Sequence, residues 1–116
     1  MGDRTIDFVD MDFGTGKITD KSATGKIIYI DRFGNIITNI NGIRLREILD
    51  FGKKIMAFIG DKQEDILFVK SYNFVKKGQT LATIGSSNYL EIGINRGNAA
   101  KKLDVKTDDE VKILFN

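Results

Sequence analysis

Short runs of β-branched and aromatic residues, separated by turn residues, recur along most of this sequence. A run of this length and composition predicts a buried or half-buried β-strand. About seven or more short strands joined by tight turns predict an all-β fold, a mostly antiparallel barrel or sandwich. The runs are Ile27–Ile30, Ile36–Ile37, Ile55–Ile59, Ile66–Val69, Leu81–Ile84, Tyr89–Ile94 and Val111–Phe115.

Two segments break this pattern and predict one or two short helices. Residues 43–50 carry apolar side chains at helical spacing, with Asn41 as N-cap and Gly52 as a stop. Residues 98–103 predict one or two helical turns capped by Asn98. Both are too short to be the crossover helices of a parallel sheet.

The chain of 116 residues is long enough for one domain with a real core. We expect a β domain over residues 25–116, preceded by an N-terminal extension or edge strand over residues 1–24. Within the latter, Ile6–Asp10 alternates in polarity as an edge strand does.

The chain contains no histidine and no cysteine, so we expect neither catalytic residues nor a metal site in it. A formal charge of +2 without a basic cluster argues against nucleic acid as a partner. No apolar run approaches the roughly 18 residues of a membrane span. We therefore expect no membrane partner and take the cytoplasm as the default location.

Motifs for phosphate or calcium binding are incomplete. Gly16-Lys17 and Gly25-Lys26 lack the following hydroxyl residue of a phosphate-binding loop, so they are interpreted as turns. The acidic run Asp108–Glu110 lacks the other ligands of a calcium loop.

Two stretches are richer in special residues than folding requires, and the first is Tyr29–Ile40. It is either a simple hairpin turn or a nucleobase site. In the second interpretation, Phe33 and Asn35 lie two residues apart, and in an extended segment they point the same way. An aromatic face beside an amide suits a purine.

The second stretch is Ile84–Ala100, which combines a turn, a strand, another turn and a helix cap. Gly93 within the strand indicates a bulge or a close backbone approach. Arg96 beside Gly97 at a helix start favours an anionic group there.

Together, the Ile-Asp-Arg-Phe-Gly-Asn…Thr-Asn-Ile block at Ile30–Ile40 and the block at Ser86–Ala100 resemble a known family. The chain resembles, from about Gly25 onward, the C-terminal domain of the S-adenosyl-L-methionine (SAM) hydroxide adenosyltransferases, relatives of fluorinase and chlorinase. The resemblance implies hydrolysis of SAM to adenosine and L-methionine by attack of water at ribose C5′. It implies SAM as substrate and no metal or other cofactor.

The resemblance also implies a division of labour. The water-activating residues belong to a larger N-terminal α/β domain, so this chain alone is expected to be inactive. Its β domain would contribute the adenine pocket and part of the methionine site. It would face the N-terminal domain of a neighbouring subunit in a homotrimer.

Eight substrate-binding residues follow from the resemblance. Phe33 would stack on adenine, Asn35 would hydrogen-bond its edge, and Asp31 would pair with the methionine ammonium. The remaining five would contact the base through a second aromatic wall, through serine groups and through the backbone of a turn; they are Tyr72, Ser86, Ser87, Asn95 and Arg96.

Two alternatives remain open on sequence alone. One is a free-standing barrel that binds single-stranded nucleic acid or a nucleotide on an aromatic platform of Tyr29, Phe33, Tyr72 and Tyr89. The other is an oligomerisation domain in which both motifs serve only folding.

Overall fold

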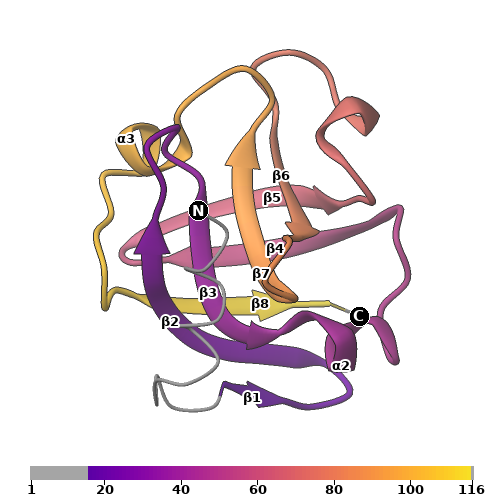
Figure 1. The fold of residues 1–116 in the computed structure, drawn as a ribbon. Helices are drawn as coiled ribbons and strands as arrows, with labels where there is room; N and C mark the ends of the chain where they lie inside the picture. The colour runs from indigo at the N-terminus through magenta and orange to yellow at the C-terminus, as the bar shows by residue number, and fades with distance from the viewer. Residues whose placement is uncertain (1–15, 116) are drawn as a thin grey trace.

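The computed structural model describes residues 16–115, which fold into a mostly β structure with two short helices (Figure 1). The strands are β1 (Lys17–Ile18), β2 (Ser22–Ile30), β3 (Ile36–Asn41), β4 (Lys53–Ile59), β5 (Lys62–Phe68), β6 (Thr80–Ile84), β7 (Tyr89–Ile94) and β8 (Glu110–Leu114). The helices are α2 (Gly42–Arg46), α3 (Ala99–Leu103) and the 3-10 turn η1 (Tyr72–Phe74). The seven predicted strands are all present, and the all-β prediction is confirmed.

Seven strands close into a barrel. The hydrogen-bonded order is β2-β3-β7-β6-β5-β4-β8, and β8 returns to pair with β2 from Ser22↔Leu114 to Lys26↔Glu110. Because the first and last strands of this order pair with each other, the architecture is a barrel and not a sandwich. A closed barrel has no unpaired edge strands. The short β1 adds only to β2.

The pairings are antiparallel except for β5 with β6. Residues 69–79, which include η1, connect these two strands and carry the chain back so that β6 runs in the same direction as β5. A small outer cluster of Val69, Val75 and Leu81, with Tyr72 packed against it, fixes this connection to the barrel. The connection thereby brings Tyr72 to the outer face of β7.

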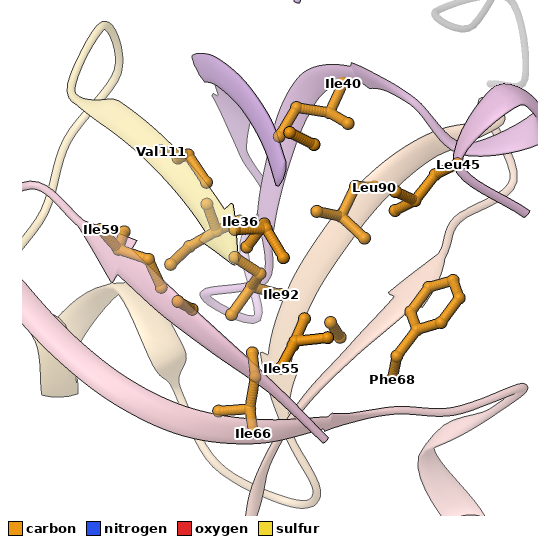
Figure 2. Packing of buried hydrophobic residues seen from close by; sticks show 14 of the residues in the cluster. Ile36, Ile40, Leu45, Ile55, Ile59, Ile66, Phe68, Leu90, Ile92 and Val111 are labelled. Carbon is orange, nitrogen blue, oxygen red and sulfur yellow. The ribbon is translucent and has the colours of Figure 1, made fainter. Parts of the chain in front are cut away.

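The barrel interior is filled by apolar side chains from all seven strands. Figure 2 labels those of β3, β4, β5, β7 and β8, together with Leu45 of α2. Alternation places Leu90, Ile92 and Ile94 of β7 inside, while Tyr89 and Glu91 are half-buried on the outer face. This confirms the period of two expected for that segment. The outer face of β7 is therefore available for side chains that do not build the core.

Both predicted helix caps are present. The Asn41 side chain accepts a hydrogen bond from Arg44 N at 3.1 Å, and the Asn98 side chain accepts one from Lys101 N at 2.9 Å. The first helix is shorter than predicted, because it ends at Arg46 rather than continuing to Asp50. There the Glu47 N–H turns back to the carbonyls of Arg44 and Leu45, which tightens the last turn.

The expected boundary between residues 24 and 25 lies inside β2, since that strand begins at Ser22. The predicted edge strand Ile6–Asp10 lies outside the described residues. No helix within residues 16–115 is long and apolar enough to cross a membrane.

Candidate functional site

An open groove of about 500 Å³ is lined by side chains from the β2–β3 turn, from η1 and from the end of β7 with the turn that follows it. Its volume falls in the range of small-molecule sites. Four of the eight predicted site residues line it: Phe33, Asn35, Tyr72 and Arg96. The other lining residues are Ile94, Gly97 and Asn98.

The β2–β3 turn is organised by Asp31. Its Oδ1 accepts hydrogen bonds from the backbone N–H groups of Phe33 and Asn35, both at 2.9 Å. Its Oδ2 accepts a third from the Asn35 side-chain amide at 3.1 Å. These bonds fix the backbone on which Phe33 and Asn35 stand. Asp31 itself lies beside the groove and is half-buried.

The same turn is attached to α3, so the two special stretches of the sequence meet in space. Ala100 N donates to Gly34 O at 2.9 Å. Gly34 has a φ of 84° and lies directly against the Asn98 side chain, where a Cβ would collide with it. Glycine is therefore required at residue 34 both for its backbone conformation and for its close contact.

Phe33 is unusually exposed for a phenylalanine, at 64%. The Arg32 guanidinium carbon lies 5.2 Å from its ring centroid, within the range of a cation–π contact. The ring is therefore held at the surface rather than packed in the core. Such a side chain is available to a ligand.

Tyr72 reaches the groove from the 69–79 connection and lies over Gly93 of β7. A Cβ at residue 93 would collide with the Tyr72 ring and hydroxyl. The group that approaches Gly93 most closely is thus the side chain of Tyr72, where the sequence predicts a bulge or a backbone segment. Tyr72 Oη donates a hydrogen bond of 2.7 Å to Glu91 Oε2.

Glu91 is the residue of this site that the sequence reasoning missed. Burial raises the pKa of its carboxyl above the ordinary value; the hydrogen bond from Tyr72 lowers that pKa, and the negative charge of Asp31 raises it. Burial also raises the pKa of the Tyr72 phenol, with further increases from its bond to Glu91 and from the charges of Glu91 and Asp31. The phenol is therefore a protonated donor at neutral pH. The available signal is the position of Glu91 on the same outer face as Gly93.

Asn95 has a structural part in the site. Its Nδ2 donates to Val75 O at 2.9 Å, its backbone N–H donates to Gln79 O at 3.1 Å, and its carbonyl accepts from Gly78 N at 2.7 Å. These bonds occupy the Asn95 backbone and attach the 69–79 connection to the end of β7. Arg96 follows in a left-handed turn with a φ of 60°, is exposed and lines the groove.

Ser86 and Ser87 lie at the other end of β7, in the β6–β7 turn next to α2 (Figure 1). A strand rises about 3.4 Å per residue, so the six residues of β7 separate this turn from Arg96 by about 20 Å. The structure does not bring the two serines to the groove. Glu91 lies between this turn and the groove. Its side chain packs against Gly85 on the side of the turn and accepts the hydrogen bond from Tyr72 on the side of the groove.

Of the four aromatic residues considered as a nucleic-acid platform, Tyr29 is 39% exposed and Phe33 is 64% exposed. Tyr72 and Tyr89 are half-buried. Within residues 16–115, no group of three or more acidic side chains is arranged to hold a metal ion.

The chain is similar to known proteins over most of its length. A family model described as the SAM hydroxide adenosyltransferase C-terminal domain matches residues 25–112. An (R)-S-adenosyl-L-methionine hydrolase of Methanocaldococcus jannaschii is 40% identical over 95 residues, which cover 78% of this chain and 35% of the relative. A hydrolase of the same name from Thermus thermophilus is 27% identical over 90 residues, covering 78% of this chain and 31% of the relative. The chain thus spans about a third of the length of these curated relatives.

Solved structures show the same fold. The crystal structure of an uncharacterised conserved protein from Thermotoga maritima matches with a TM-score of 0.82 and 28% identity, over 90% of this chain and 40% of that one. A conserved hypothetical protein from Thermus thermophilus matches with a TM-score of 0.62 and 27% identity, over 78% of this chain and 34% of that one. Since the family model covers most of the barrel and both special stretches, this chain belongs to the SAM hydroxide adenosyltransferase C-terminal domain family.

Proposed function

We propose that this chain is the adenosyl-binding part of an enzyme that hydrolyses S-adenosyl-L-methionine to adenosine and L-methionine. The observation that carries the proposal is the convergence of Phe33, Asn35, Tyr72 and Arg96 on one groove. Two relatives named as SAM hydrolases support the choice of substrate.

The groove offers the groups that a purine needs. Phe33 and Tyr72 present aromatic surface, and stacking on such rings is worth about 1–3 kcal/mol per base. Asn35 presents an amide at the same wall, which can donate to and accept from the edge of the base. Ser86 and Ser87 stay outside this assignment because of their distance along β7, and their contact with the base remains a prediction.

Asp31 would bind the methionine ammonium. An ionised carboxylate has about four acceptor sites, and three hydrogen bonds within the turn use three of them. One site on Oδ2 remains for a cationic donor. Opposite charges attract more strongly in a partly desolvated site than in open water.

In the proposed reaction, the oxygen of water bonds to ribose C5′ as the C5′–S bond breaks. The bonding electrons go to sulfur, so the sulfonium becomes the neutral thioether of methionine, and the water loses one proton. The groups that activate water would come from an N-terminal α/β domain, without a metal or other cofactor. This chain would hold the nucleoside in place, and orientation alone contributes substantially to such a displacement.

The openness of the groove fits a site completed by another domain. We propose that an N-terminal domain of a neighbouring subunit covers it in a homotrimer, and that the enzyme works in the cytoplasm. Phe33, which lines the groove at 64% exposure, is a side chain that such a covering domain would bury.

A hybrid enzyme tests the proposal. This chain replaces the matching 95-residue segment of the Methanocaldococcus jannaschii relative, and SAM hydrolysis is followed by chromatography. The hybrid should form adenosine and methionine, and Asn35→Ala should raise its KM for SAM. Asn41→Ala, at the opposite end of β3, is the matched control and should leave KM unchanged. An active hybrid whose KM is indifferent to Asn35→Ala would contradict the assignment of the groove.

The two alternatives give different results. A nucleic-acid module would bind oligonucleotides with an affinity that falls steeply with salt. A purely structural oligomerisation domain would assemble with no response to adenosine or SAM.

A further inference from the structure

We propose that Asp31 determines which purine the groove accepts, by fixing the orientation of the Asn35 amide so that it selects a 6-amino purine over a 6-oxo purine. The inference rests on the proposed function and deepens it. Nothing about the methionine end of the substrate enters the argument.

The orientation of Asn35 follows from the chemistry of its partner. Asp31 Oδ2 lies 3.1 Å from Asn35 Nδ2, and an ionised carboxylate can only accept hydrogen bonds. The NH₂ end of the Asn35 amide must therefore face Asp31, and the carbonyl Oδ1 must point away from it. In an isolated asparagine the two ends of the amide are interchangeable; here the carboxylate removes that freedom.

Asp31 cannot rotate to accommodate the other orientation. Its Oδ1 is held by the backbone N–H groups of Phe33 and Asn35, both at 2.9 Å. The turn is held in its own place by the bond from Ala100 N to Gly34 O and by the contact of Gly34 with Asn98. The carboxylate is thus a fixed reference for the Asn35 side chain.

Asn35 lines the groove, so its outward oxygen and its second N–H are the groups that a ligand meets. An acceptor beside a donor matches the 6-amino group and N7 of adenine, the pairing that asparagine makes with this base elsewhere. A 6-oxo purine would instead bring its own acceptor against Oδ1. A site built for one hydrogen bond penalises a ligand that leaves it unmade, so a preference of about tenfold is expected.

Asp31→Asn should reverse the preference. The introduced amide can keep its oxygen on the two backbone N–H groups, but its NH₂ then replaces Oδ2 and faces the NH₂ of Asn35. Rotation of the Asn35 amide by half a turn removes this donor–donor conflict. The groove then presents NH₂ to the 6-position, where it can donate to a 6-oxo group; the bond to N7 is lost for both purines, so the preference reverses while both bind more weakly.

The test uses adenosine and inosine, which lack the amino-acid part of SAM and so leave the ammonium site empty. Each nucleoside is titrated into this chain and into Asp31→Asn, and backbone amide shifts are followed by NMR. We expect the chain to bind adenosine about tenfold more tightly than inosine, and Asp31→Asn to prefer inosine. Asn35→Ala, which removes the amide, should bind both nucleosides equally and more weakly than the unaltered chain binds adenosine.

The outcomes separate the two proposals. Binding of both nucleosides in the groove with equal affinity, or an unchanged preference in a folded Asp31→Asn variant, would overturn the specificity inference alone. Absence of any shift in the groove would overturn the adenosyl-binding function as well. If Asp31→Asn does not fold, the affinity of the unaltered chain for purine riboside, which has no 6-substituent, tests the inference in its place. Purine riboside should bind with an affinity between those of adenosine and inosine, and any other order contradicts the inference.

Discussion

The hydroxyl of Tyr72 donates a 2.7 Å hydrogen bond to Glu91 Oε2 while its ring lies over Gly93. Three residues thus place one wall of the groove: a glycine that leaves room, a carboxylate that accepts, and a tyrosine from a connection distant in sequence. A methyl group at residue 93 would take the space of the ring.

Gly93→Ala should therefore destabilise the protein by about 1–3 kcal/mol, the usual cost of overpacking. Denaturation by urea measures the change in the free energy of unfolding. The three atoms nearest to a Cβ at residue 93 all belong to Tyr72, so the cost should be much smaller in a Tyr72→Ala background. Equal costs in the two backgrounds would show that the collision with Tyr72 is not the cause.

Glu91 should make stability depend on pH above its ordinary pKa of 4.5. Because burial raises the pKa in the folded protein, folding binds a proton here, and the slope of stability against pH is negative. The Glu91 contribution is fully present below the unfolded pKa and is lost as pH rises through the folded one. Glu91→Gln keeps an acceptor for Tyr72 and should remove this loss. The difference in unfolding free energy between the two proteins should thus shift in favour of Glu91→Gln on going from about pH 4 to about pH 7. A difference that does not vary with pH would contradict the raised pKa.

Gly34→Ala should weaken both folding and nucleoside binding, because a Cβ would collide with the Asn98 side chain and the φ of 84° disfavours alanine. Asn98→Gly removes the side-chain atoms that a Cβ at residue 34 would meet, and glycine is tolerated as a helix N-cap. In this background Gly34→Ala should lose its steric part and retain a backbone cost of about 1–2 kcal/mol. Thermal unfolding of the four proteins measures the coupling, and strictly additive losses would refute the contact.

Asn41→Ala should cost about 1 kcal/mol, because it removes the cap of α2. The groove begins at Asn35, at the opposite end of β3, so nucleoside affinity should stay unchanged. Asn41→Ser should restore most of the stability. A loss of nucleoside binding in the folded Asn41→Ala protein would mean that the groove is not confined to its own end of the barrel.

The hybrid enzyme should be insensitive to removal of metal ions. The proposed displacement has no step that requires one. Dialysis against a chelator followed by the hydrolysis assay checks this. A rate that falls with the chelator and returns with a divalent cation would refute the metal-free reaction.

The sequence predicts the elements of this protein well because their determinants are local. Alternating residues place Leu90 and Ile92 inside the barrel, and the caps at Asn41 and Asn98 need only residues three positions away. Closure of the barrel through β2 and β8 depends on pairing between the two ends of the described chain, which no local pattern encodes. The sequence therefore leaves open the choice between a barrel and a sandwich, and the pairing of β2 with β8 decides it.

The residues of the candidate site also fall into those with a local sequence signal and those that depend on distant parts of the chain. Phe33 and Asn35 could be singled out because they stand two residues apart in one turn. Glu91 could not, because its role depends on Tyr72, which arrives through the 69–79 connection. Ser86 shares a sequence block with Arg96, which groups it with the other site residues, yet a whole strand separates the two in space.

Titration of this chain with adenosine, followed residue by residue by NMR, tests the central claim most directly. The open groove predicts weak binding, with shifts concentrated at Phe33, Asn35, Tyr72 and Arg96. Asn35→Ala should weaken the binding that these shifts report, and Asn41→Ala should leave it intact. Shifts that lie elsewhere on the barrel, or that persist unchanged in Asn35→Ala, would contradict the assignment of this groove to the adenosyl group.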